Sequence, residues 1–315
     1  MKQRIEWIDI AKGILIILVI LGHSHVNGYV DYVIYSFHMA GFFLLSGITF
    51  NGRRQFKVFL TRKIRSLLLP YVVFSLLLIA YQYAGHILFR TNFSLVGGLL
   101  SMLFPISGRE GTTVYHLWFL PCLFLAEIAV YWIVRVYIKN KVTGIGVAFA
   151  GILFSLLVYK LTGIASVISA LPIAVGFMLV GVCLGSRLKT QNRYLAVVSA
   201  LLFAFFTVCN YQFGAKSVDM SSMSLGIWPL FMLSGIAGSL ALFSISRIWG
   251  KCRLIENIGK DSLYYYGLHY EILGVASQIR GGIIATILTI CLLYLVITSS
   301  QKTISKMTKK GRLES

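Results

Sequence analysis

The chain has 315 residues, of which 57% are hydrophobic and only 12% are charged, and its mean hydropathy is +0.81. This composition excludes an ordinary soluble domain, in which about 25% of residues are charged. The net charge of +19 is spread over many short polar segments rather than one folded face, so no nucleic-acid partner is expected. The expected fold class is an all-α integral membrane protein, because lipid offers no hydrogen-bond partner to open backbone groups.

Ten apolar segments are long enough for transmembrane helices, each of which takes roughly 20 residues. In chain order they cover residues 7–27, 32–50, 66–85, 114–137, 143–161, 165–186, 194–213, 225–246, 258–278 and 281–300. A further apolar stretch at 93–106 is too short to span, and we expect a re-entrant or interfacial element of an outer loop there. No soluble domain separates these segments, so residues 1–315 are expected to form one transmembrane domain.

The basic residues predict the orientation, because short loops rich in Lys and Arg stay in the cytoplasm. With the amino terminus inside, the inner segments hold 24 of the 29 Lys and Arg residues. The five on the outer side are Arg90, Arg109, Lys160, Lys216 and Arg280. Only an even number of helices keeps both basic termini inside. We therefore expect about ten spans of the plasma membrane with both termini cytoplasmic.

The cysteines give no sign of a metal site. Their positions lack metal-ligand spacing, and most fall within predicted spans: Cys122, Cys183, Cys209, Cys252 and Cys291. Neither a metal, a disulfide nor a permanently bound cofactor is expected.

The first predicted helix carries ionisable groups on one face. Lys12 and His23 are eleven residues apart, which is about three helical turns and roughly 16 Å along the axis. Asp9 precedes Lys12 by three residues and shares this face. His25 points about 200° further round the helix, so it cannot share the role of His23. His23 is either a functional base or an interfacial histidine that hydrogen-bonds a neighbour.

The fourth predicted helix repeats the eleven-residue spacing with His116 and Glu127. Glu127 would lie near the middle of the membrane, where it must be protonated or hold a cationic partner. A purely structural hydrogen bond between helices is the alternative. Two more histidines on predicted spans, His38 and His269, could line the same cavity or serve structural roles.

The densest basic stretch covers residues 53–65, on the cytoplasmic side of the predicted topology. Arg62 and Arg65 are three residues apart and would share a helical face just before the third span. Arginine offers forked donors that match phosphate oxygens, which topology alone does not require. The pair is therefore a candidate phosphate site.

Together these segments resemble the membrane-bound acyltransferase-3 family of bacterial enzymes, which O-acetylate surface polysaccharides and similar sugars. The resemblance covers nearly the whole chain, although residues 143–246 carry little motif. Lys12 stands where the family more often has arginine. The matching residues are Lys12 and His23; Phe42, Phe43, Ser46 and Gly47; Arg62 and Arg65; Leu117, Trp118, Phe119 and Leu120; and Gly259, Lys260, Ser262, Leu263, Tyr266 and His269.

The resemblance implies transfer of an acyl group, expected to be acetyl, from cytoplasmic acyl-CoA to a hydroxyl of a cell-envelope sugar or polysaccharide. His23 would act as general base or carry an acyl-imidazole intermediate. Lys12, Arg62 and Arg65 would contact the donor. His116 and Glu127 would orient the base or the acceptor. No extracellular hydrolase-like domain is expected, which would leave the acceptor open and permit a partner protein in polysaccharide synthesis.

Two other classes of function fit intramembrane histidine and glutamate. A polytopic transporter or exporter of a sugar or sugar-lipid would carry them as a proton relay. A non-catalytic partner of a polysaccharide synthase is the other possible class of function. Loss of sugar O-acylation in His23→Ala, with the amount and location of the glycan unchanged, would favour the enzyme.

Overall fold

The computed structural model describes residues 5–103, 114–136, 141–163, 166–185 and 193–313, and in these ranges the regular elements are helices. One isolated β-bridge joins Asp219 to Ser224. The chain divides into two compact units, one formed by its two ends, up to Ile34 and from Trp249, and the other by Tyr35–Ile248. Each unit is described by itself.

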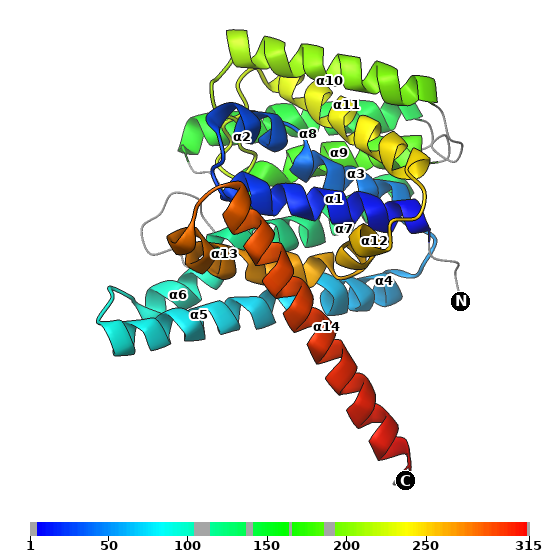
Figure 1. The fold of residues 1–315 in the computed structure, drawn as a ribbon. Coiled ribbons are helices and arrows are strands. Elements are labelled where there is room, and N and C mark those ends of the chain that lie inside the picture. The colour runs from blue at the N-terminus through cyan, green and yellow to red at the C-terminus, as the bar shows by residue number, and fades with distance from the viewer. Residues whose placement is uncertain (1–4, 104–113, 137–140, 164–165, 186–192, 314–315) are drawn as a thin grey trace. The chain divides into compact units, whose positions relative to one another are not determined.

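The unit formed by the chain ends is built around its first helix. Its elements are α1 (Glu6–His23), most of α2 (Gly28–Tyr35), α12 (Arg253–Lys260), α13 (Ser262–Ile279) and α14 (Ile283–Leu313). Helix α1 packs against α12, α13 and α14 (Figure 1). Its apolar residues supply much of the buried core, because Leu15, Ile16 and Ile20 are fully buried.

Two glycines let α1 and α12 meet at backbone distance. A Cβ atom on Gly13 would lie 2.2 Å from the carbonyl oxygen of Ile255, and one on Gly259 would lie 1.7 Å from that of Asp9. No side chain fits at either position without separating the helices. Close approach of this kind is the usual role of small residues between membrane helices. The two glycines therefore fix the register of α12 along α1.

The second unit contains the remaining helices. They are α3 (His38–Thr49), α4 (Phe56–Lys63), the π-helical turn η1 (Ile64–Leu68), α5 (Leu69–Phe89), α6 (Leu95–Leu103), the 3₁₀ turn η2 (Tyr115–Leu117), α7 (Phe119–Val136), α8 (Lys141–Thr162), α9 (Val167–Leu184), α10 (Arg193–Phe213) and α11 (Trp228–Ile248). Helix α9 is central, because α3, α7 and α8 all pack against it. Helices α10 and α11 lie side by side (Figure 1).

Helices α3 and α9 also meet through glycines. A Cβ atom on Gly47 would lie 2.1 Å from the carbonyl oxygen of Met178, and one on Gly181 would lie 2.3 Å from that of Leu44. Gly47 thus provides the close helix packing that a small residue at this position predicts.

The ten predicted spans fall mainly on helical residues, although 32–50, 114–137 and 258–278 each include a break between two helical elements. Seven helical segments are long and apolar enough to cross a membrane. The other three predicted spans correspond to α1, α8 and α13. Helix α1 begins with Glu6, Asp9 and Lys12, α13 is rich in tyrosine, and the apolar part of α8 is short. The chain is a multi-pass helical membrane protein. The count of ten and the cytoplasmic termini stay predictions.

The stretch predicted not to span contains the short helix α6. This helix has nine residues and packs against α5, where the Tyr71 hydroxyl donates to the carbonyl oxygen of Met102 at 2.6 Å. Nine helical residues reach only about 14 Å, so α6 cannot cross a membrane. Residues 104–106 of the predicted stretch lie outside the described residues.

Candidate functional site

The three ionisable residues of α1 lie where the unit packs. Asp9 is buried, whereas Lys12 and His23 are half-buried. Helix α1 ends at His23, so His25 is not on the helix at all. It adopts a left-handed conformation with φ 50°, and its exposed ring lies 3.7 Å from the carboxylate of Asp31. The two neighbouring imidazoles therefore occupy different environments, as their spacing predicts, although a turn rather than a helical face separates them.

His23 lies beside a second imidazole. The ring centres of His23 and His269 are 5.3 Å apart with 36° between the planes. Tyr270 meets His23 edge to face at 5.7 Å. His269 is completely buried, and its Nδ1 lies 2.8 Å from the carbonyl oxygen of Tyr266 one turn earlier on α13. The structure thus brings together two of the predicted site residues, 246 positions apart in sequence, within the unit formed by the chain ends.

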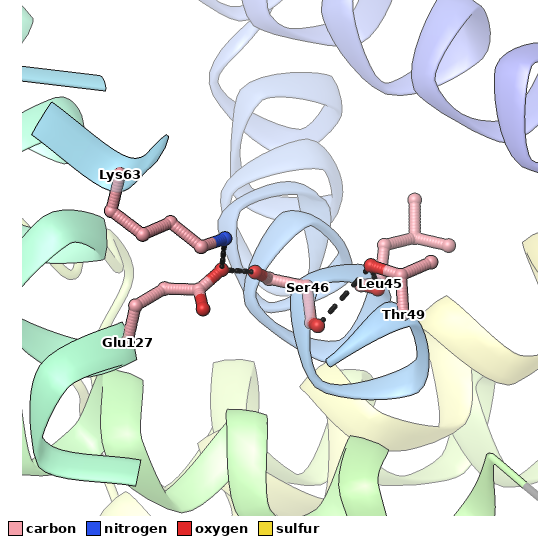
Figure 2. Close-up of polar contacts among 5 residues, drawn as sticks. All are labelled: Leu45, Ser46, Thr49, Lys63 and Glu127. Carbon is pink, nitrogen blue, oxygen red and sulfur yellow. Dashed lines mark hydrogen bonds and ion pairs between the residues drawn. The ribbon is translucent and has the colours of Figure 1, made fainter. Parts of the chain in front are cut away.

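In the second unit, the buried carboxylate of Glu127 holds a cation, as a carboxylate in this setting requires. Its Oε1 accepts from Nζ of Lys63 at 2.5 Å and from the hydroxyl of Ser46 at 2.5 Å (Figure 2). Glu127 is 1% exposed. Its other oxygen, Oε2, is also buried and makes no hydrogen bond within the described residues. Helices α3, α4 and α7 each contribute one member of this cluster.

Lys63 is a functional-site candidate that was not predicted from the sequence. It lies between Arg62 and Arg65 as the last residue of α4, where the chain changes from α-helix to the π-helical turn η1. This turn packs against α7, the helix that carries Glu127. A π-helical turn in a longer helix often marks a functional site, but no sequence pattern here announces one. The signal that could have found Lys63 is the need of Glu127 for a cation.

A row of side chains on α7 holds the segment 52–63 in place. Glu127, Tyr131 and Arg135 follow at intervals of four and so lie on one face. The Tyr131 hydroxyl donates to the carbonyl oxygen of Arg54 at 2.9 Å, and Arg135 donates to the same oxygen at 2.8 Å. The Phe59 ring stacks on Tyr131 at 4.7 Å. These contacts anchor the segment 52–63 on α7.

The two arginines of the predicted phosphate site are not part of this anchor. Arg62 and Arg65 are both exposed, one at the end of α4 and the other in η1. Exposed guanidinium groups beside a fixed segment are available to a ligand, whereas the half-buried Lys63 is bound to Glu127.

The remaining predicted histidines are buried in the second unit. His38 begins α3, and its ring meets that of Tyr35 edge to face at 5.0 Å. His116 lies in the 3₁₀ turn η2, before α7 begins at Phe119. The expectation that one continuous α-helix carries both His116 and Glu127 is therefore wrong. A 3₁₀ turn winds more tightly than an α-helix, so the eleven-residue spacing does not define a common face.

A helical bundle with buried ionisable groups in both units defines a multi-pass membrane protein with a polar interior. A family model described as an acyltransferase domain matches residues 5–300. The chain therefore belongs to the acyltransferase-3 family, as its motifs predict, and it is a membrane acyltransferase. No curated protein and no solved structure matches the chain significantly.

Proposed function

We propose that this protein transfers an acyl group, expected to be acetyl, from acyl-CoA to a hydroxyl of a cell-envelope sugar or polysaccharide. The observation that carries the proposal is the position of His23, half-buried at the end of α1 and beside His269. Membership of the acyltransferase-3 family supports the reaction type. The alternatives, a transporter and a non-catalytic synthase partner, draw no support from a specific contact in the structure.

The chemistry needs one base. A sugar hydroxyl is a weak nucleophile at neutral pH, and an imidazole can take its proton as the oxygen attacks the thioester carbonyl. The carbon–sulfur bond then breaks, the ester forms, and the proton on His23 passes to the leaving thiolate of CoA. His23 returns to its starting state, so neither a metal nor a bound cofactor enters the cycle.

The donor is proposed to approach the basic segment from the cytoplasm. Arg62 and Arg65 are exposed beside a segment that α7 holds in place, and guanidinium groups suit the phosphates of CoA. This assignment also uses the predicted orientation, in which 24 of the 29 basic residues are cytoplasmic. Lys12 on α1 is proposed as a further donor contact, with Asp9 beside it on the same helix face.

The test is acetyl transfer from labelled acetyl-CoA to envelope glycan, in membranes that contain each variant at matched abundance. His23→Ala should lower the rate roughly 10²- to 10⁴-fold, which is the usual contribution of a general base. His25→Ala is the matched control, because its exposed ring lies off α1 and beside the carboxylate of Asp31 on α2. It should keep most of the activity.

The same membranes separate the three classes of function. An enzyme mutant leaves the amount and location of the glycan unchanged and removes only its acyl groups. A changed location of the glycan would indicate a transporter. Full transfer by His23→Ala, or equal losses in the His23 and His25 variants, would remove His23 as the base.

A further inference from the structure

The tautomer of His269 is set by its own helix. Its Nδ1 lies 2.8 Å from the carbonyl oxygen of Tyr266, and a carbonyl oxygen can only accept a hydrogen bond. Nδ1 must therefore carry the proton. In a neutral ring, Nε2 then carries no proton and can accept a hydrogen bond. The hydrogen bond made by one nitrogen of a histidine thus determines the role of the other. His269 is fully buried, and burial favours the neutral ring.

The separation of the two imidazoles suits a hydrogen bond between them. With an N–H···N distance of about 2.9 Å and about 1.2 Å from each nitrogen to its ring centre, two rings facing each other in line have centres about 5.3 Å apart. The observed separation is 5.3 Å, with a tilt of 36°. A parallel stack would bring the rings closer. Nε2 of His269 is itself buried, and the half-buried His23 ring lies at the end of α1.

The glycine contacts explain why the two rings meet. Gly13 and Gly259 hold α1 and α12 at backbone distance. From Gly13 to His23 is ten residues, and from Gly259 to His269 is also ten. The ten residues from Gly13 all lie on α1 and advance about 15 Å, whereas those from Gly259 cross the break at Asp261 between α12 and α13. Both segments lead from the glycine contact to the paired imidazoles. Helix α1 packs against both α12 and α13, as this register requires.

We infer that His269 is a positioning residue, which accepts a hydrogen bond from one nitrogen of His23 and thereby leaves the other nitrogen as the base. The inference rests on the proposed function. It assigns to His269 the part that a carboxylate or carbonyl plays beside many reactive histidines, where the partner fixes both tautomer and ring orientation. The buried, neutral imidazole performs it here without placing a charge in the apolar core of this unit.

Two variants of His269 separate the two nitrogens. The amide of His269→Asn reaches the place of Nδ1 and keeps only the bond to the Tyr266 carbonyl. The amide of His269→Gln reaches the place of Nε2 and keeps an acceptor for His23. Partners that orient a histidine are worth roughly 10- to 100-fold in activity. We therefore expect His269→Asn to lower kcat by about this factor with KM for acetyl-CoA unchanged, and His269→Gln to restore most of the rate.

The measurement is steady-state acetyl transfer in membranes, together with the thermal midpoint of each variant in detergent. Equal losses of kcat in the Asn and Gln variants would overturn the inference and leave a packing role. Full activity of His269→Asn would also overturn it. If His23→Ala is inactive while His269→Asn is fully active, only this inference fails. If His23→Ala is itself active, the proposed function fails first.

Discussion

The two units hold their buried polar groups in opposite ways. In the unit formed by the chain ends, His23 and His269 are two imidazoles in ring contact, and a neutral imidazole can both donate and accept a hydrogen bond. In the other unit, Lys63 and Glu127 form an ion pair that Ser46 completes. A buried ion pair of this kind ties its two helices together, because removing either partner leaves the other charge uncompensated. The first arrangement suits chemistry and the second suits fixed architecture.

The difference also separates two uses of polar residues within a membrane protein. Intramembrane ionisable residues are functional candidates by default. The contacts show that Glu127 anchors α4 to α7 through Lys63, whereas His23 at its helix end keeps an accessible side. Breaking the ion pair should therefore affect stability first, and altering the imidazoles should affect rate first.

The largest loss of stability is expected from removing one partner of the Lys63–Glu127 ion pair. Lys63→Ala leaves the carboxylate of Glu127, which is 1% exposed, without its cation. Removing one partner of a buried pair costs about 3–5 kcal/mol, and the side chain of Lys63, 27% exposed, places this pair near the lower end. The measurement is the thermal midpoint of the purified protein in detergent.

A surface pair supplies the matched control. Lys251 and Glu6 lie 3.6 Å apart with side chains 75% and 54% exposed. Exposed pairs contribute about 0–1 kcal/mol, so Lys251→Ala should barely move the midpoint. A similar midpoint for Lys63→Ala and Lys251→Ala would contradict the architectural role of the Lys63–Glu127 pair.

A smaller loss of stability is expected from Gly13→Ala, which places a Cβ atom 2.2 Å from the carbonyl oxygen of Ile255. Overpacking typically costs about 1–3 kcal/mol. Gly274 on α13 belongs to the same unit and has open space around its Cβ position. Gly274→Ala should instead stabilise by about 0.4–1 kcal/mol through the lower entropy of the unfolded chain.

Gly13 and Gly47, one in each unit, provide a further test of the difference between the units. Because Gly13 sets the register that brings His23 to His269, Gly13→Ala should lower the rate per folded molecule as well as the stability. Gly47→Ala meets the carbonyl oxygen of Met178 at 2.1 Å in the other unit and should lower stability alone. An equal loss of rate per folded molecule in both variants would break the comparison.

The smallest effect is expected at the proposed donor site, from a change that keeps the positive charges but alters the geometry of the groups that carry them. Replacing Arg62 and Arg65 together by Lys removes forked contacts to phosphate while leaving both positive charges. We expect KM for acetyl-CoA to rise about tenfold, which corresponds to about 1.4 kcal/mol, with the thermal midpoint unchanged because both side chains are exposed. The double Ala variant should raise KM further. If the double Lys variant were fully active, bulk positive charge rather than a forked contact would account for phosphate binding.

The sequence predicted the helices well because apolar length is a property of each segment by itself. The predicted spans fall mainly on helices, three of them with a short break, and the short α6 lies where no span was expected. The site was harder to predict. The prediction placed His25 on a second face of the first helix, but α1 ends at His23. His116 lies in a 3₁₀ turn before α7, which hydropathy does not reveal. Lys63 went unnoticed because its partner lies 64 residues away and the π-helical turn leaves no sequence signature.

The glycine contact between α1 and α12 has a consequence for how the protein is made. Gly13 leaves the ribosome early, whereas its neighbour Ile255 follows 242 residues later, so at 5–20 residues per second α1 waits roughly 10–50 s for its partner. During that interval the whole of the second unit is synthesised. A nascent chain that stops before Ile255 therefore carries His23 without the helix that places it. Packing around the His23 end of α1 is thus a late event of biosynthesis, although its residues are among the first to be made.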